Sequence, residues 1–202
     1  MGRPKEFDRD QVLGKATELF RRLGFAATST QRLVEHLGIN RKSMYAEFGS
    51  KQELFEAALE RYDKVTVGRN FGPLETPRAG LPEVEQVIEL FARGATGKAS
   101  GLGCLLCNTA VERAAADKAT RRFVDRYFER LTDAFENALD NAQRAGEIDR
   151  EVDTIAQARF LTSAVLGIAV LVRAKAPPAI VEGAAEVALA HVASLVPAAK
   201  VL

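Results

Sequence analysis

The chain has 202 residues, of which 47% are hydrophobic and 27% charged, and its formal net charge is +1. This length allows one large domain, or a small domain joined to a larger one, with enough apolar residues for a core. The near-neutral charge excludes a protein that coats nucleic acid through overall basicity, so any such binding must rest on local charge. Trp is absent and Ala and Leu are abundant, a balance that predicts an all-α fold.

The chain begins with charged residues and lacks an apolar signal segment, which predicts a cytosolic protein with reduced cysteines. Its most apolar run, residues 160–172, is shorter than the about 20 residues that a membrane span needs. Neither His36 nor His191 has a second ligand-type residue at metal spacing. We therefore expect no membrane span, no metal and no cofactor.

Two helices are predicted at the N-terminal end. Residues 9–23 repeat apolar side chains at helical spacing, with Asp8 as the N-cap and Gly24 at the end. Thr28 and Gln31 then form a cap pair that opens a short second helix.

Two more helices follow closely. Asn40 is placed to cap a short helix over residues 41–48, and Ser50 with Glu53 forms a capping box that opens a longer helix over 51–66. Four short helices, each with its own start signal, make a locally consistent unit.

Helix 41–48 is too short to be stable alone and begins with two adjacent cations. Its length of about 12 Å at 1.5 Å per residue fits the major groove, and Arg can pair with guanine through two hydrogen bonds. Helix starts also suit phosphate, and cations in an N-terminal arm suit the minor groove. A solvated helix face is the alternative. The predicted DNA contacts are Arg3, Lys5, Thr28, Ser29, Thr30, Arg41, Lys42, Ser43, Tyr45 and Lys51.

Residues 19–62 resemble the DNA-binding domain of the TetR/AcrR family of transcriptional regulators. The resemblance implies a homodimeric, all-helical regulator with an N-terminal helix-turn-helix and a helical effector-binding C-terminal domain. It also implies phosphate contacts for Ser43, Tyr45 and Lys51. The matching elements are Gly24-Phe25, Thr28-Ser29, Gly38-Ile39, Ser43-Met44-Tyr45, Phe48 and Ser50-Lys51.

Residues 67–82 are rich in Gly and Pro, which predicts a connector between a DNA-binding domain at 1–66 and a helical ligand-binding and dimerisation domain at 67–202. The second domain is expected to contain helices at 83–94, 105–115, 118–145, 153–174 and 178–196.

Cys104 and Cys107 lie at a predicted helix start, where a thiol pKa is lowered. They are interpreted as core residues, as effector-pocket lining or as a thiol sensor. Asn108 and Glu112 lie one turn apart and either anchor an effector or face solvent. Together these four residues are the candidate site for an apolar or amphipathic effector.

The last two predicted helices are apolar on more than one face, which predicts burial on most sides. Pairing with their symmetry mates would form a four-helix bundle, whereas packing within one chain is the alternative. The predicted dimer-interface residues are Leu161, Val165, Ile168, Ala184, Ala188 and Val192.

These features predict a repressor that a small molecule releases from a palindromic operator on double-stranded DNA. Two alternatives remain open: a cysteine-based thiol or redox-responsive protein or enzyme, and a DNA-binding protein without an effector. No catalytic residue is assigned.

Overall fold

A computed structural model describes residues 7–96 and 100–197, and these described residues form helices, turns and loops without a strand. The all-α prediction is therefore confirmed. The helices are α1 (Arg9–Leu23), α2 (Thr30–Leu37), α3 (Arg41–Phe48), α4 (Lys51–Tyr62), the π-helix η1 (Asp63–Val67), α5 (Gly68–Phe71), the 3₁₀ helix η2 (Gly72–Glu75), α6 (Leu81–Ala92), the 3₁₀ helix η3 (Arg93–Ala95), α7 (Leu105–Glu112), α8 (Lys118–Ala145), α9 (Thr154–Arg173) and α10 (Pro178–Ser194).

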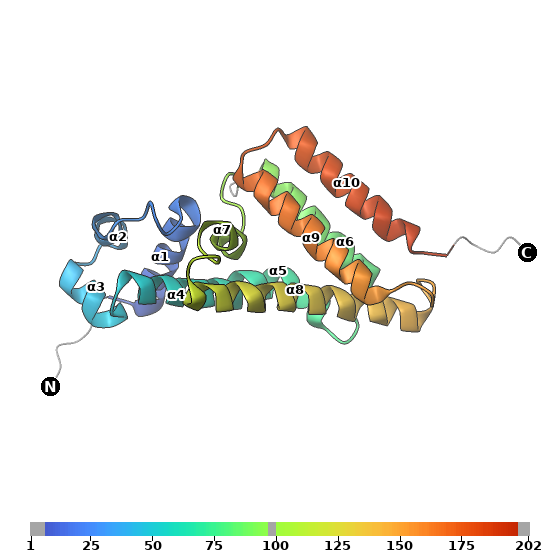
Figure 1. Ribbon diagram of the computed structural model, residues 1–202, viewed down its shortest axis with the longest axis horizontal. Helices are drawn as coiled ribbons and strands as arrows, with labels where there is room; N and C mark the ends of the chain where they lie inside the picture. Colours follow the sequence, from blue (N-terminus) through green and yellow to red (C-terminus); the bar gives the residue numbers. More distant parts are fainter. Residues whose placement is uncertain (1–6, 97–99, 198–202) are drawn as a thin grey trace, which may run out of the picture.

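The molecule is elongated, with α1, α2 and α3 at one end and α6, α9 and α10 toward the other (Figure 1). The long helix α8 runs from near α4 and α7 to below α9 in Figure 1 and packs against α9. Helix α7 lies between the two ends and contacts α1 and α4 on one side and α8 and α9 on the other. This arrangement makes α7 a bridge between the N-terminal helices and the rest of the chain.

An aromatic contact and an ion pair join α1 to α4. The rings of Phe20 and Phe55 meet edge to face with centroids 4.9 Å apart, a favourable aromatic geometry. Arg61 holds the carboxylate of Asp10 through Nε and Nη2 at 3.0 and 3.1 Å. These contacts fix the helical unit that carries α2 and α3.

The predicted N-caps Asp8, Asn40 and Ser50 are confirmed, but the prediction for α2 is wrong by one residue. Ser29 caps α2 by accepting a hydrogen bond from the backbone N–H of Arg32. The Thr28 hydroxyl instead donates to the carbonyl of Gly24.

The predicted connector at 67–82 is wrong, because the chain stays helical from α4 through η1, α5 and η2. Val67, Phe71 and Leu74 recur at helical spacing and are buried, which holds this glycine-rich segment in the core. Asn137 of α8 fastens its end by donating to the carbonyl of Leu74 at 2.6 Å. The proposed border at residues 66 and 67 therefore falls inside continuous helix, and the two-domain division stays a prediction.

Helix α9 is long and apolar enough to cross a membrane by length and composition alone, whereas the sequence suggested that its apolar run was too short. It packs against α8 and α10, and Ala158, Leu161 and Val165 are completely buried. A core helix apolar on several faces produces the same hydropathy signal.

Candidate DNA interface and ligand cavity

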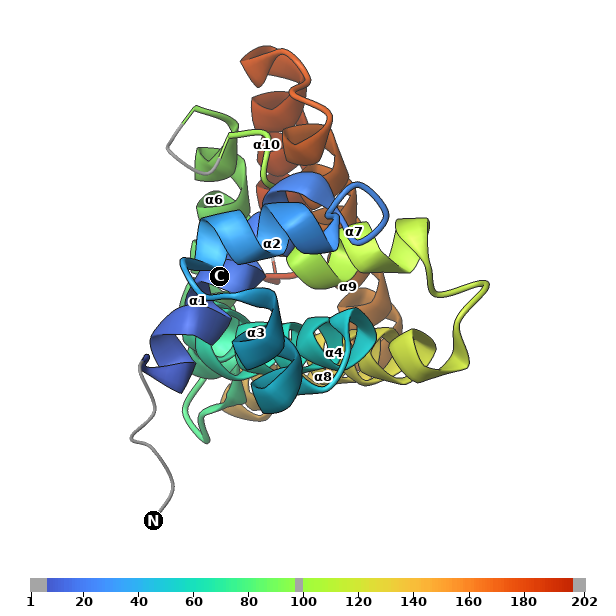
Figure 2. The same ribbon diagram turned by 90° about the vertical axis from the view of Figure 1, so that its left-hand side faces the viewer.

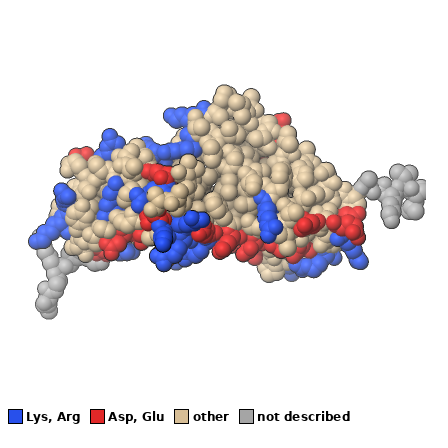
Figure 3. Space-filling model, viewed as in Figure 1, with Lys and Arg blue, Asp and Glu red and all other residues tan. Residues whose placement is uncertain are grey.

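The buried side of α3 leaves its N-terminal cations exposed. Met44 and Phe48 pack into the core, which turns Arg41 and Lys42 outward, as predicted. Helices α2 and α3 lie together with the start of α4 at the end of the molecule that faces the viewer in Figure 2. Lys and Arg side chains lie at this end of the surface in Figure 3, interspersed with acidic and other residues.

Tyr45 links α3 to the start of α2. Its hydroxyl lies 3.3 Å from the hydroxyl of Thr30, and the Arg41 guanidinium lies 5.5 Å from the centre of its ring. The hydrogen bond with Thr30, and then that with Arg41, lowers the pKa of Tyr45. These contacts hold the Tyr45 hydroxyl beside Arg41, where it can hydrogen-bond with a phosphate oxygen.

Most backbone N–H groups in the first turns of α3 and α4 are available as hydrogen-bond donors. At α3, Asn40 accepts from the backbone N–H of Ser43 at 2.8 Å, and at α4 Ser50 accepts from that of Glu53 at 3.1 Å. The other first-turn N–H groups have no partner within the helix, so they remain donors for an anion.

Three of the predicted DNA contacts need comment. The side chain of Thr28 is completely buried, its hydroxyl donates to the carbonyl of Gly24 and its backbone N–H donates to that of Phe25, so the prediction that it contacts phosphate is wrong. Arg3 and Lys5 lie outside the described residues.

Lys51 lies at the inner edge of this surface, with Nζ 4.0 Å from the centre of the Phe25 ring. Burial, followed by repulsion from Arg113, lowers its pKa.

A junction joins α7 to the loop between α1 and α2. The carboxylate of Glu112 accepts from the backbone N–H groups of Phe25 and Ala26 at 3.0 and 2.8 Å. The Arg113 guanidinium lies 3.7 Å from the centre of the Phe25 ring and donates to Gln52 of α4 at 3.0 Å. Glu112 is therefore a structural contact, and the prediction that it anchors an effector is wrong.

Asp117 completes this junction and is expected to make stability depend on pH. Arg113 and Thr120 hold the pKa of its carboxyl well below the ordinary value of about 4. The carboxylate therefore stabilises the fold above that ordinary pKa, and the stabilisation is lost as pH falls toward the lower folded-state value.

We expect Asp117→Asn to lower the free energy of unfolding by about 1–2 kcal/mol near neutral pH. The difference from the natural protein should shrink by about 1 kcal/mol between about pH 5 and pH 3, measured by urea unfolding. Asp133→Asn, at an exposed position on α8, is the control. A difference for Asp117→Asn that is the same at both pH values would contradict the role of ionised Asp117.

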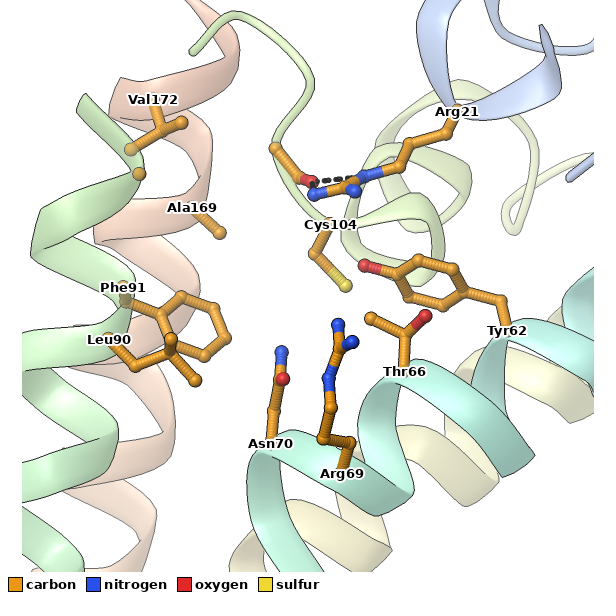
Figure 4. Close-up of a pocket in the computed structure, with 12 residues that line it drawn as sticks. Arg21, Tyr62, Thr66, Arg69, Asn70, Leu90, Phe91, Cys104, Ala169 and Val172 are labelled. Atoms are coloured by element: carbon orange, nitrogen blue, oxygen red, sulfur yellow. Dashed lines mark hydrogen bonds between the residues drawn. The ribbon is translucent and has the colours of Figure 1, made fainter. Parts of the chain in front are cut away.

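A cavity of about 190 Å³ opens between the N-terminal helices and the body of the molecule (Figure 4). Its residues come from α1, the α4–α5 segment, α6, the start of α7 and α9. They are Arg21, Tyr62, Thr66, Arg69, Asn70, Leu90, Phe91, Gly94, Gly103, Cys104, Ala169 and Val172.

Of the four predicted effector residues, Cys104 lines this cavity and the other three do not. Its Sγ donates to the hydroxyl of buried Tyr127 at 3.2 Å. Cys107 is buried nearby, and burial raises its pKa to about 12, which disfavours a reactive thiolate. Asn108 donates to the carbonyl of Leu102 at 2.9 Å.

Sequence reasoning missed most of the polar lining of the cavity. Thr66, Arg69 and Asn70 stand at i, i+3 and i+4, which places them on one helical face. This helical spacing can be recognised in the sequence, but the interpretation of residues 67–82 as a connector left no helix on which to place it.

The predicted dimer-interface residues are also placed differently. Leu161, Val165 and Ile168 of α9 are buried inside the chain, as are Ala188 and Val192 of α10. Ala184 is partly buried against the same core. Small residues let α9, α10 and α6 approach one another closely, so the five buried residues serve packing within the chain and the predicted interface is wrong for them, whereas that for Ala184 stays a prediction. The exposed face of α9 and α10 instead presents Phe160, Ser163, Gly167, Val170, Ile180, Val187 and Ala190.

Comparison with known families covers both halves of the chain. Residues 12–58 match the family described as "Bacterial regulatory proteins, tetR family". Residues 80–188 match "Tetracyclin repressor-like, C-terminal domain".

Curated relatives align with this chain over most of their length. The chain is 33% identical to the uncharacterized HTH-type transcriptional regulator YezE of Bacillus subtilis, over 87% of this chain and 91% of the relative. It is 32% identical to the HTH-type transcriptional repressor ComR of Escherichia coli, over 85% of this chain and 82% of the relative.

Solved structures share the fold. A cysteine mutant of the TetR family regulator CifR, complexed with 26-bp double-strand operator DNA, superposes with a TM-score of 0.80 at 25% identity. That alignment covers 93% of this chain and 98% of CifR. The reduced form of Escherichia coli NemR gives a TM-score of 0.80 at 20% identity, over 96% and 98% of the two chains.

Proposed function

The chain belongs to the TetR family of bacterial regulatory proteins, and on that premise we propose that it represses transcription as a homodimer bound to a palindromic operator. The family makes it a DNA-binding transcriptional regulator. Residues 1–66 are the proposed DNA-binding domain and 67–202 the proposed ligand-binding and dimerisation domain. Because it acts on DNA, we place it in the cytoplasm.

The observation that carries this proposal is the exposed start of α3. Arg41 and Lys42 project from it, while Thr30 orients the hydroxyl of Tyr45 beside them. This combination offers a cation for base edges and a hydroxyl for phosphate on one helix of groove-fitting length. The similarity to the repressor ComR and to the operator-bound CifR supports repression through operator binding.

Dimerisation is proposed through the exposed face of α9 and α10. Phe160 and Val187 are 43% and 69% exposed, which is unusual for large apolar side chains. Gly167 and Gly183 have nothing within 4 Å of where a side chain would begin, so a partner helix has room to approach. A two-fold axis through this face would present two copies of α3 to two operator half-sites.

Release from DNA is proposed to follow binding of a small molecule in the cavity. The cavity contacts both the DNA-binding helices, through Arg21 of α1, and the C-terminal helices, through Ala169 and Val172 of α9. A ligand that favours one placement of these parts shifts operator affinity, and couplings of this kind are about 1–3 kcal/mol. The same coupling requires operator DNA to weaken ligand binding by an equal factor.

A thiol-based function is less well supported. The buried Cys107 has its pKa raised to about 12, and Cys104 is engaged with Tyr127. We assign no catalytic residue.

The assignment of base reading to Arg41 is tested by substitution. Arg41→Ala should reduce discrimination at one base pair of each half-site by about 1–3 kcal/mol. Lys51→Ala should weaken binding to all sequences similarly and make the salt dependence less steep. Fluorescence anisotropy with operator and random duplexes, at several salt concentrations, measures both effects.

Arg78→Gln, which removes a charge from an exposed turn outside the cavity lining, is the control. Equal losses for Arg41→Ala on operator and on random DNA would show that Arg41 does not read a base.

A further inference from the structure

The cavity carries positive charge without a neutralising acid. Arg21 enters it from α1 and Arg69 from α5, and no Asp or Glu belongs to its described lining. A guanidinium prefers a carboxylate because its planar N–H groups match the two oxygens of that anion. The charge of the cavity therefore selects for a negative ligand.

Arg69 is the cation best placed to meet such a ligand. It makes no hydrogen bond or ion pair with any other residue that the structure describes. Figure 4 shows its side chain pointing into the cavity between those of Thr66 and Asn70. The amide of Asn70 and the hydroxyl of Thr66 add hydrogen-bonding groups on the same helical face, so three polar side chains converge at this wall.

Arg21 is partly engaged already. Its Nε and Nη2 both donate to the carbonyl of Gly103, at 2.8 and 2.5 Å. Its Nη1 makes no hydrogen bond within the described part of the chain. Arg21 therefore ties α1 to Gly103, two residues before the start of α7, and still contributes its charge to the cavity.

The opposite wall is apolar. Leu90 and Phe91 of α6 face the polar wall, with Ala169 and Val172 of α9 beside them (Figure 4). The volume of about 190 Å³ is below the range of about 300–1,000 Å³ typical of pockets for drug-sized ligands. A ligand must therefore be compact, with one apolar end and one polar end.

We propose that this cavity binds a compact amphipathic carboxylate, with its carboxylate at Arg69 and Asn70 and its apolar body against Leu90 and Phe91. The sequence predicted an apolar or amphipathic ligand held by Asn108 or Glu112, and the cavity replaces both anchors with residues of α5. This assignment rests on the proposed function, in which the cavity is the effector site. It adds the charge of the ligand and the residue that recognises it.

The test compares benzoate with benzamide, which share a ring and nearly the same size but differ in charge. Isothermal titration of the full-length protein should show benzoate binding about tenfold more tightly, since a charged hydrogen bond exceeds a neutral one by about that factor. In ¹⁵N-labelled protein, benzoate should shift the backbone amide signals of Asn70 and Gly94, which locates it in the cavity.

Arg69→Gln should remove most of the preference for benzoate over benzamide, because only the charge of Arg21 then remains in the cavity. Arg78→Gln removes the same charge outside the cavity lining and should keep the preference. Equal affinity of the natural protein for the two compounds, a preference that Arg69→Gln leaves undiminished, or no benzoate binding at about 10 mM, where even a weak fragment registers, would each overturn the proposal. Operator affinity is measured separately with and without benzoate. Binding without any change in operator affinity would count against the proposed regulation and leave the carboxylate site intact.

Discussion

The substitution Val187→Glu is expected to convert the proposed dimer into monomers and to reduce operator affinity by at least about 100-fold. Val187 projects from α10 with 69% of its surface exposed, so a carboxylate there does not disturb the single chain. In the proposed dimer the same carboxylate would be buried near its symmetry mate. Removing two like charges from water costs several kcal/mol, which is enough to separate the subunits.

Operator affinity should fall with the dimer because two joined recognition helices bind with the advantage of a high effective concentration. Sedimentation velocity measures the assembly state, and circular dichroism checks that the helical content is unchanged. Val111→Glu is the matched control, since Val111 is an exposed apolar residue of α7 that is not part of the proposed dimer face on α9 and α10. An intact dimer for Val187→Glu would place the interface on another surface.

The neighbouring substitution Ala188→Glu would not make this test. Ala188 is buried against the chain's own helices, so a charge there would destabilise the monomer itself. Monomers or aggregates of that variant would say nothing about the interface. The proposed dimer interface is therefore tested at position 187, which is exposed, and not at position 188, which is buried.

Signals confined to one turn of helix were predictable from the sequence. Asp8, Asn40 and Ser50 cap their helices by accepting hydrogen bonds from backbone N–H groups two or three residues further along the chain. Such a cap depends on neighbouring residues alone, so it can be predicted from the local sequence. At Thr28 and Ser29 two capping residues are adjacent, and local pattern cannot choose between them. Tertiary packing decides, since Thr28 is drawn into the core and Ser29 is left at the helix start.

Signals that depend on distant partners were not predictable in the same way. An Ala-rich face fits a helix of the same chain as well as a helix of a second copy, so the sequence could not say which helix covers α10. The junction is a similar case: Glu112 meets Phe25 and Ala26 across 86 or 87 positions of sequence. The spacing of neighbouring residues does not predict such a contact. The polar face of Thr66, Arg69 and Asn70, in contrast, follows a helical spacing that can be recognised in the sequence.

The contact between Glu112 and the α1–α2 loop bears on how the proposed ligand binding could affect DNA binding. Helix α4 is one route, because it joins the two parts along the chain. Helix α7 offers a second route, since Cys104 before its first turn lines the cavity and Glu112 at its last turn holds the loop before α2. Its eight residues span about 12 Å, so a shift at one end reaches the other without passing through α4.

Glu112→Ala is expected to lower operator affinity about tenfold without changing the assembly state. Loss of the carboxylate frees the backbone N–H groups of Phe25 and Ala26, so the DNA-binding helices sample more orientations and pay an ordering cost on DNA. A hydrogen bond to a charged acceptor contributes about 1.5–3 kcal/mol, and solvent exposure places this contact at the low end. Hydrogen exchange at the two amides should accelerate.

Glu112→Gln, which keeps one acceptor oxygen, should recover part of the operator affinity. Glu129→Ala, at an exposed position of α8, should change neither the operator affinity nor the hydrogen exchange. Faster exchange at both amides with unchanged operator affinity would leave α4 as the element that orients the DNA-binding helices.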